Sequence, residues 1–355
     1  MAHVCQGFTV SNELSLANLG WQPFFQQQLS LDEWQELAPA RVVEQHRSAI
    51  EVATASGHAS LPVVHSMPAL TVGDWVLLDG GGTFLRALER KSCFRRRAAG
   101  AIAQEQLLAA NVDVALIVCS LNDDFNLNRI ERYLSVVNNA DAEPVIVLSK
   151  SDLCRDPEAY RAEVQKLDSM LCVELVNNLA DGGADVLRPW CRPGKTVVLL
   201  GSSGAGKSTL ANTLLGQDRQ STGVIRESDA KGKHTTTRRS LIAMSGGAMI
   251  LDTPGMRELQ LADCEQGVAT TFADIEELAR NCRFGDCAHN SEPGCAVRTA
   301  IDAGELEERR YLNYCKLARE QALNTASLAE RRAAEKKRGR YYKTIQRESR
   351  GVRRD

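Results

Sequence analysis

The 355-residue chain lacks the features that direct a protein into or across a membrane. Residues 1–20 have no basic start followed by an apolar run, so no secretory signal is expected. No stretch approaches the ~18 uninterrupted apolar residues of a membrane span. The eleven cysteines are therefore expected to be reduced rather than paired in disulfides. Together these absences predict a cytoplasmic protein with no membrane partner.

The chain also lacks a large net charge of either sign, since 43 Lys and Arg residues against 45 Asp and Glu give a formal net charge of -2. Its cations are nonetheless clustered. Residues 331–355 hold eleven Lys or Arg against three acids. A second cluster consists of Arg86, Arg90, Lys91, Arg95, Arg96 and Arg97. Such clusters are either solvated surface or sites for a polyanion, and the other motifs decide between these readings.

The length predicts two or three domains. Residues 1–37 are interpreted as an N-terminal arm. Short strand-like segments with turn residues predict a small all-β barrel or sandwich at 38–100. At 101–270, apolar runs alternate with helical segments, which is typical of βαβ units around a buried parallel sheet. These runs are 112–119, 144–148, 173–176 and 196–200, with a helix at 127–137 and a hairpin of 240–244 and 248–251. Residues 271–355 contain Cys and His and then become helical.

A phosphate-binding loop follows the apolar run at 196–200 and precedes a helical segment at 210–215. The pattern G-x-x-x-x-G-K-[ST] in this strand–loop–helix context is specific for nucleoside triphosphates. Its glycines let consecutive N–H groups point at phosphate oxygens, and the helix N-terminus adds positive potential. Lys207 is expected to reach the β- and γ-phosphates, and Ser208 to bind Mg²⁺. The loop consists of Gly201, Ser202, Ser203, Gly204, Ala205, Gly206, Lys207, Ser208 and Thr209.

The base is indicated by Ser149, Lys150, Ser151 and Asp152, which follow another apolar run. They resemble the N/T-K-x-D element of GTPases, in which the Asp carboxylate accepts hydrogen bonds from guanine N–H groups. Ser149 departs from the usual Asn or Thr. Asn177 and Asn178 also stand where a Ser-Ala-like element is usual. Alone, this short pattern could be a polar strand end. In a chain that also contains the phosphate loop, it predicts guanine specificity.

Two further segments complete the GTPase set. Asp252 and Gly255 belong to the D-x-x-G element. Asp252 is expected to hold Mg²⁺ through water, and Gly255 is expected to donate its N–H to the γ-phosphate. Thr236 lies in a polar loop and is expected to bind Mg²⁺ when GTP is present. Met256 replaces the Gln that often orients the attacking water. His234 is our candidate for that task, although it could equally be an ordinary surface residue.

A compact Cys/His segment follows. Cys282, Cys287, His289 and Cys295 supply three thiols and one imidazole. This set fits a closed tetrahedral zinc site with a structural role, because no ligand position is left for a reacting water. A cluster of free thiols or a redox pair is the alternative reading. Zinc would let a segment with little core fold independently.

The order of these motifs is unusual, because the base-reading element precedes the phosphate loop. With this permuted order and the Cys/His site, the chain resembles the ribosome small subunit-dependent GTPase A family (RsgA/YjeQ). The Ala110–Asp113 segment and residues 336–346 look similar as well. The resemblance implies a multidomain α/β protein with an N-terminal OB-fold β-barrel, a circularly permuted P-loop GTPase domain and a C-terminal zinc-binding helical domain.

The resemblance also implies GTP hydrolysis in late maturation of the small (30S) ribosomal subunit, stimulated by that particle. We therefore expect the basic clusters to contact 16S rRNA. OB-folds commonly bind nucleic acid, which agrees with this expectation. An ATP-using P-loop enzyme and a nucleotide-gated RNA-binding module with incidental hydrolysis remain the alternatives. Nothing in the sequence indicates an obligate dimer, so a monomer is expected.

Overall fold

A computed structural model describes residues 15–46, 48–97, 105–122, 124–216, 239–244, 246–252 and 264–325. The chain divides into two compact units. The larger unit spans 1–95 and 107–259, and the smaller unit spans 96–106 and 260–355. Within the described ranges, no helix is both long and apolar enough to cross a bilayer.

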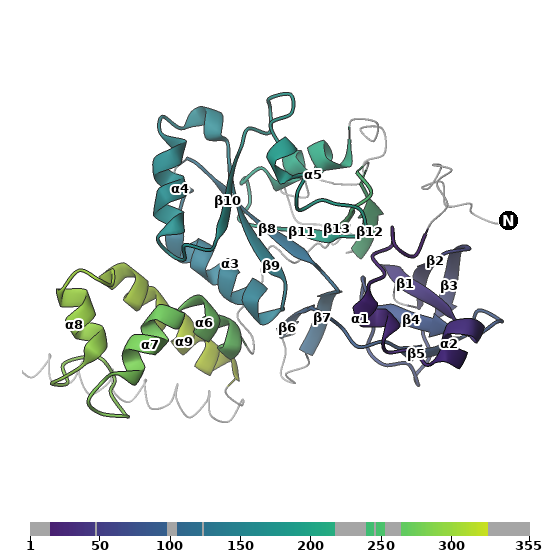
Figure 1. Ribbon diagram of the computed structural model, residues 1–355, viewed down its shortest axis with the longest axis horizontal. Helices are drawn as coiled ribbons and strands as arrows, with labels where there is room; N and C mark the ends of the chain where they lie inside the picture. The colour runs from purple at the N-terminus through teal and green to yellow at the C-terminus, as the bar shows by residue number, and fades with distance from the viewer. Residues whose placement is uncertain are drawn as a thin grey trace, which may run out of the picture. The chain divides into compact units, whose positions relative to one another are not determined.

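The larger unit is built around parallel strands in the order β10-β9-β8-β11-β13 (Figure 1). All five are rich in Val, Ile and Leu, as expected for strands that are buried on both faces. Their bounds are β8 Val114–Ser120, β9 Glu143–Ser149, β10 Cys172–Val176, β11 Thr196–Leu200 and β13 Met249–Asp252. The parallel sheet predicted from the apolar runs is therefore confirmed.

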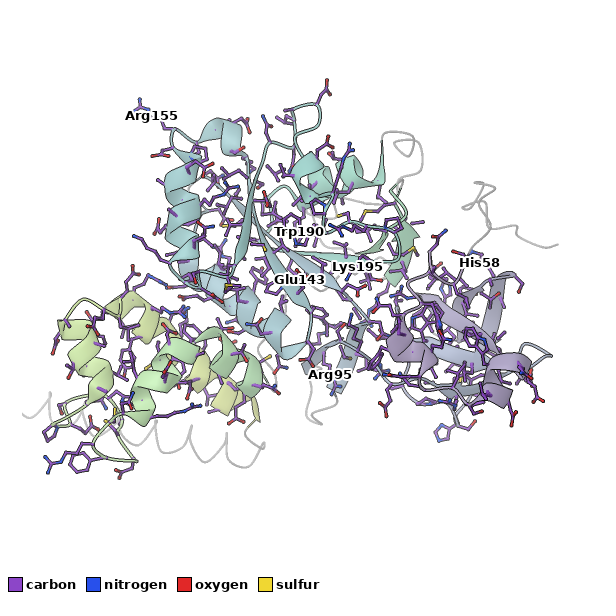
Figure 2. The ribbon with its side chains drawn as sticks, in the orientation of Figure 1. His58, Arg95, Glu143, Arg155, Trp190 and Lys195 are labelled. Atoms are coloured by element: carbon purple, nitrogen blue, oxygen red, sulfur yellow. The ribbon has the colours of Figure 1, made fainter. Side chains whose placement is uncertain are left out.

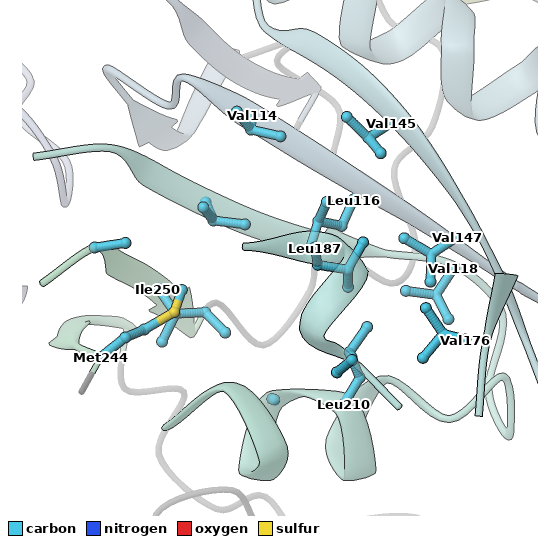
Figure 3. Packing of buried hydrophobic residues seen from close by; sticks show 14 of the residues in the cluster. Val114, Leu116, Val118, Val145, Val147, Val176, Leu187, Leu210, Met244 and Ile250 are labelled. Carbon is cyan, nitrogen blue, oxygen red and sulfur yellow. The ribbon is translucent and has the colours of Figure 1, made fainter. Parts of the chain in front are cut away.

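Helices cover this sheet. Helix α3 (Leu127–Asn139) packs on β8 and β9, helix α4 (Pro157–Gln165) packs on β10, and α5 (Lys207–Leu215) follows β11. Leu210 of α5 joins a core with Val118, Val147 and Val176 on one face of the sheet, and Leu187 lies among them (Figure 3). This core anchors α5, and with it the loop that precedes α5, against the sheet.

A hairpin continues the sheet beyond β13. Strand β12 (Arg239–Ala243) pairs with β13 in antiparallel fashion, which confirms the predicted hairpin. Strand β1 (Ala38–Gln45) then pairs with β12 through Glu44 opposite Ser240 and Gln45 opposite Arg239. The N-terminal strands and the parallel strands thus belong to one hydrogen-bonded sheet.

The N-terminal strands form an antiparallel set in the order β3-β2-β1-β4-β5. Their bounds are β2 Ala49–Thr54, β3 Gly57–Pro62, β4 Trp75–Leu78 and β5 Phe84–Ala87. Strand β3 carries few apolar residues and did not stand out in the sequence. Alternate side chains of these strands, including Val42, Ile50, Val52 and Val76, share a separate apolar core. A further pair, β6 (Cys93–Arg97) and β7 (Glu105–Ala110), forms a two-stranded sheet.

The described part of the predicted arm is folded onto these strands. It contains α1 (Pro23–Gln26) and α2 (Leu31–Glu36), and Ser30 caps α2 in a reciprocal capping box with Glu33. The Trp21 ring lies 4.8 Å from Trp75, edge to face, and 6.0 Å from Trp34. Trp75 is fully buried, so the arm supplies part of this aromatic core.

Buried polar side chains join β1 to the amino ends of the parallel strands. Arg41 of β1 donates hydrogen bonds to the carbonyl oxygen of Leu19, to that of Asn111 (3.2 Å) and to Thr196 Oγ1 (2.7 Å). Burial lowers the pKa of Arg41 to about 10, which leaves the guanidinium charged at neutral pH. The network ties three segments that are distant in sequence to one cation.

Asp113 forms a second junction at the same end of the sheet. Its carboxylate accepts the Thr196 N–H at 2.9 Å and the Gln22 amide at 2.9 Å. Lys91 and Lys195 approach it at 3.2 and 3.7 Å, and Lys195 is labelled in Figure 2. Burial alone would raise the pKa of Asp113, but the hydrogen bonds and the two lysines hold it below its ordinary value.

In the smaller unit, the described residues 264–325 form the helices α6 Glu265–Thr271, α7 Ala273–Arg280, α8 Ala296–Asp302 and α9 Glu308–Thr325. Arg310 of α9 is buried and forms a two-pronged ion pair with Asp274 of α7, with both distances at 2.8 Å. These contacts fix α9 against α7, the helix that precedes the loop carrying the Cys/His segment.

Candidate guanine-nucleotide and metal sites

The phosphate loop has the predicted context, because Gly201–Gly206 connects β11 to α5. Gly201, Gly204 and Gly206 all have positive φ, at 139°, 78° and 93°. A Cβ on Gly201 would lie 2.2 Å from the carbonyl oxygen of Val118, so only glycine fits against β8 there. Ser208 and Thr209 lie in the first turn of α5. The loop therefore has the backbone that a phosphate cradle requires.

Lys207 closes over this loop. Its ammonium donates to the carbonyl oxygens of Gly201, at 2.9 Å, and of Ser202. These contacts hold the positive charge at the mouth of the loop, where phosphate oxygens would replace the carbonyl groups as partners.

The base-reading element lies beside the phosphate loop, because β9 and β11 run in the same direction and end at the same edge of the sheet. Ser149 is the last residue of β9, and Lys150 turns the chain with φ of 57°, a strained conformation for lysine. Asp152 follows, exposed, in a short 3-10 helix at Ser151–Leu153. The tertiary fold thus brings the two predicted elements together.

Side chains from the base-reading loops contact the phosphate loop directly. Lys150 Nζ donates to the carbonyl oxygen of Gly204 at 2.8 Å, and Ser149 Oγ donates to that of Ala205 at 2.6 Å. Asn178, which follows β10, donates its amide to the carbonyl oxygen of Gly206 at 3.3 Å. The two predicted nucleotide-binding elements are therefore in direct contact with each other.

Asp124 contacts the phosphate loop, although it was not among the predicted site residues. Its carboxylate accepts hydrogen bonds from Ser202 of the phosphate loop and from Arg129 of α3. Burial alone would raise the pKa of Asp124, but these two hydrogen bonds lower it. A signal was available, because Asp124 closely follows the carboxyl end of β8, the edge at which α/β sheets bind ligands.

The switch residues are described only in part. The backbone of Asp252 ends β13 and pairs with Ser240. Because β13 is parallel to β11, Asp252 lies at the same edge of the sheet as the phosphate loop. His234, Thr236 and Gly255 lie outside the described residues, as does Met256.

The predicted metal ligands converge within the smaller unit. The ligand atoms of Cys282, Cys287, His289 and Cys295 all lie within 4.8 Å of one another. The Cys282 and Cys295 sulfurs are 3.9 Å apart and lie 3.5 and 3.4 Å from His289 Nδ1. Ligands bound at the usual zinc distances of about 2.0–2.3 Å would be roughly 3.3–3.8 Å apart in a tetrahedron. The residues present fit a tetrahedral metal ion.

The loop around these ligands is held by Glu292. Its carboxylate accepts the N–H groups of Ala288, Asn290 and Ser291 at 3.1, 2.8 and 3.0 Å. Its own N–H and these three lower the pKa of the Glu292 carboxyl. His289 sits within this turn at φ of 58°, a left-handed conformation. The carboxylate thus stabilises the unusual backbone that presents the imidazole.

The basic cluster near residue 90 is largely engaged within the protein. Arg86 pairs with Glu33 at 2.9 Å, and this contact lowers the pKa of Glu33 to about 2. Arg90 pairs with the buried Asp74 at 2.6 Å, and Arg96 donates to Gln106 at 2.9 Å. Part of the cluster that the sequence assigned to RNA therefore holds the arm and the strands together.

The chain is similar to known proteins over most of its length. A sequence model described as RsgA GTPase matches residues 87–262. A Vibrio parahaemolyticus protein named small ribosomal subunit biogenesis GTPase RsgA 2 is 56% identical over 336 residues, covering 95% of this chain and 94% of the relative. A Mesorhizobium japonicum protein named small ribosomal subunit biogenesis GTPase RsgA is 46% identical over 332 residues, covering 92% and 95%.

Two solved structures share the fold. The crystal structure of YjeQ from Thermotoga maritima has a TM-score of 0.60 at 24% identity, covering 79% of this chain and 97% of that one. The structure of YloQ, described as a circularly permuted GTPase, has a TM-score of 0.57 at 23% identity, covering 80% and 94%. The permuted order inferred from the motifs is thus matched by a known architecture.

Proposed function

The chain belongs to the RsgA GTPase family, and we propose that it hydrolyses GTP to GDP and phosphate during maturation of the small (30S) ribosomal subunit. The observation that carries the proposal is the contact between the Ser149–Asp152 element and the phosphate loop. An ATP-using P-loop enzyme would leave that contact and the Cys/His cluster without a purpose. Relatives named as small ribosomal subunit biogenesis GTPases support the choice of particle.

The residues have distinct roles in this proposal. Asp152 reads the guanine N–H groups, and the N–H groups of residues 201–209 hold the phosphates. Lys207 neutralises charge on the β- and γ-phosphates. Ser208 and Thr236 would hold Mg²⁺, with Asp252 acting through water and Gly255 donating to the γ-phosphate. His234 would orient the attacking water in place of the Gln that Met256 replaces.

The N-terminal strands, the Cys/His domain and the basic residues would form the surfaces that contact RNA. Five antiparallel strands, β1–β5, support an OB-fold barrel within residues 38–100, preceded by the arm at 1–37. The ligand spacing of the Cys/His cluster supports one structural Zn²⁺ in the domain at 271–355. Exposed Arg95 and the basic tail at 331–355 would neutralise 16S rRNA phosphates. We further propose a cytoplasmic monomer with the GTPase domain at 101–270.

Turnover of GTP with and without purified small ribosomal subunits tests this function. Stimulation by small subunits, but not by large subunits, is the expected result, and ATP should not be hydrolysed. Stimulation should fall steeply as salt rises, because phosphate contacts release counterions. Turnover of GTP that no ribosomal particle changes would favour an RNA-binding module with incidental hydrolysis, and turnover of ATP would contradict the guanine assignment.

His234→Ala tests the hydrolytic role separately. Subunit-stimulated turnover should fall by about 10²-fold or more, with GDP affinity unchanged, because a water-orienting group acts mainly in the transition state. Unchanged turnover would remove His234 from the mechanism.

A further inference from the structure

Three successive carbonyl groups of the phosphate loop each receive a side-chain donor from the base-reading loops. The carbonyl oxygen of Gly204 receives Lys150, that of Ala205 receives Ser149, and that of Gly206 receives Asn178. In a trans peptide the carbonyl group and the following N–H point in opposite directions. Holding these carbonyl groups therefore also fixes the orientation of the following N–H groups, those of Ala205, Gly206 and Lys207, of which the first donates to the Ser202 carbonyl oxygen at 3.4 Å.

Two of these donors converge on one glycine. A Cβ added to Gly206 would lie 3.0 Å from Asn178 Nδ2 and 3.6 Å from Ser149 Oγ. Ser149 is fully buried, so a longer side chain at 149 would have to find room in the packed region beside Gly206 that the Asn178 amide also borders. The two side chains thus lie against the same part of the phosphate loop, although they belong to different loops.

The hydrogen bonding of Asn178 indicates why this side chain is there. Its Nδ2 reaches Gly206, whereas its Oδ1 is buried without a hydrogen-bond partner among the described residues. An amide in an ordinary core position is satisfied at both ends. Asn178 therefore makes one hydrogen bond to the phosphate loop through Nδ2, while burial of the unpaired Oδ1 lowers the stability gained from that contact.

We propose that Ser149 and Asn178 are a compensating pair in the guanine-nucleotide site. The short hydroxyl at 149 leaves room for the Asn178 amide, and Asn178 supplies the contact to the phosphate loop that a longer residue at 149 would make. Both residues depart from the usual GTPase elements, and each departure makes the other workable. Asn178 is accordingly a positioning residue for the phosphate loop, an inference that rests on the proposed binding of guanine nucleotides.

A double-mutant cycle on the full chain tests the pair, with affinity for a fluorescent GDP analogue as the measurement. Asn178→Ala should weaken binding by roughly 5- to 10-fold, the effect of losing one partly buried hydrogen bond. Ser149→Asn should be neutral or harmful beside Asn178, but it should recover most of the lost affinity in the Asn178→Ala background.

Two matched variants separate positioning from packing. Asn178→Asp keeps the size of the side chain but replaces the donor with an acceptor, so it should bind GDP no better than Asn178→Ala. Gln45→Ala removes an amide of β1 that donates to the carbonyl oxygen of Leu70 at 3.1 Å, away from the nucleotide site. This control should change GDP affinity by less than about 2-fold. Separately, the thermal unfolding midpoint of Asn178→Ala without nucleotide should match that of wild type.

The outcomes discriminate clearly. If Ser149→Asn changes GDP affinity by the same factor in both backgrounds, the two residues are independent and the inference is wrong. A loss of nucleotide-free stability that accounts for the weakened binding of Asn178→Ala would also overturn it. If folded wild-type protein binds no GDP at all, the proposed function itself fails, and the pair fails with it.

Discussion

Replacement of Arg41 by Met should destabilise the larger unit more than almost any other single change to a charged residue. Arg41 is 1% exposed and donates to Leu19, Asn111 and Thr196. Met fills a similar length of apolar space but donates no hydrogen bond. Two buried carbonyl oxygens and one hydroxyl would lose their cationic donor, and the stacking of the guanidinium over Trp75 at 5.6 Å would also be lost.

The expected loss of unfolding free energy is about 3–5 kcal/mol. Each hydrogen bond to a charged group contributes about 1.5–3 kcal/mol, and three are removed. Against this, the variant no longer buries a cation, a cost visible in the pKa of Arg41, which burial lowers to about 10. The net figure is therefore well below the sum of three bonds.

Urea unfolding followed by tryptophan fluorescence measures this loss. The four tryptophans are Trp21, Trp34, Trp75 and Trp190, and all belong to the larger unit, so the signal reports on that unit alone. Arg188→Met is the matched control, because the Arg188 side chain is 77% exposed and should change stability by no more than about 0.5 kcal/mol.

A difference between Arg41→Met and wild type of less than about 1 kcal/mol would refute the reasoning. If Arg41→Met does not fold, Arg41→Lys gives a second measurement. Lysine keeps the charge but lacks the planar guanidinium, so it cannot reach all three acceptors at once. The unfolding free energy of Arg41→Lys should therefore lie between those of wild type and Arg41→Met.

Other predictions follow from the same contacts. The pKa of Asp113 lies below its unfolded value of about 3.9, so the stabilising effect of the Asp113 carboxylate is complete above about pH 4 and is lost as pH falls through the folded pKa. The difference in urea midpoint between wild type and Asp113→Asn should therefore shrink from pH 7 to pH 3. A difference that stays constant with pH would contradict this. Gly73→Ala should cost at least about 2–3 kcal/mol by thermal unfolding, because φ is 94° and the new Cβ would meet the Ala110 oxygen at 2.0 Å; Gly80→Ala, with nothing within 4 Å, should be nearly neutral. Cys295→Ser should abolish retention of one zinc per chain in a chelator-competition assay, whereas Cys154→Ser, outside the cluster, should retain it.

Chemistry carried by neighbouring residues could be predicted from the sequence. The phosphate loop is one continuous segment between a strand and a helix, so its backbone follows from its own glycines. The four metal ligands lie within fourteen residues, and a chain that short can bring them together by local turns. The parallel strands were equally visible, because burial on both faces requires continuous apolar runs.

The carboxylate partners of the cations near residue 90 could not be predicted from the sequence. A run of basic residues has the same appearance whether it faces RNA or pairs with carboxylates elsewhere in the chain. Arg86 finds Glu33, which is 53 positions away, and Arg90 finds Asp74. Charge clustering alone therefore does not reveal which of these cations also pair with carboxylates of the protein.

The sequence by itself predicted which chemistry the chain carries: a phosphate loop, a guanine-reading element and a Cys/His metal site. Only the tertiary structure decided how these parts support one another. Ser149 meets Ala205 across 56 residues, and Arg41 meets Thr196 across 155. Such contacts depend on strand order and register, which bring strand ends to a common edge, and no local pattern in the chain encodes which distant carbonyl a given side chain will reach.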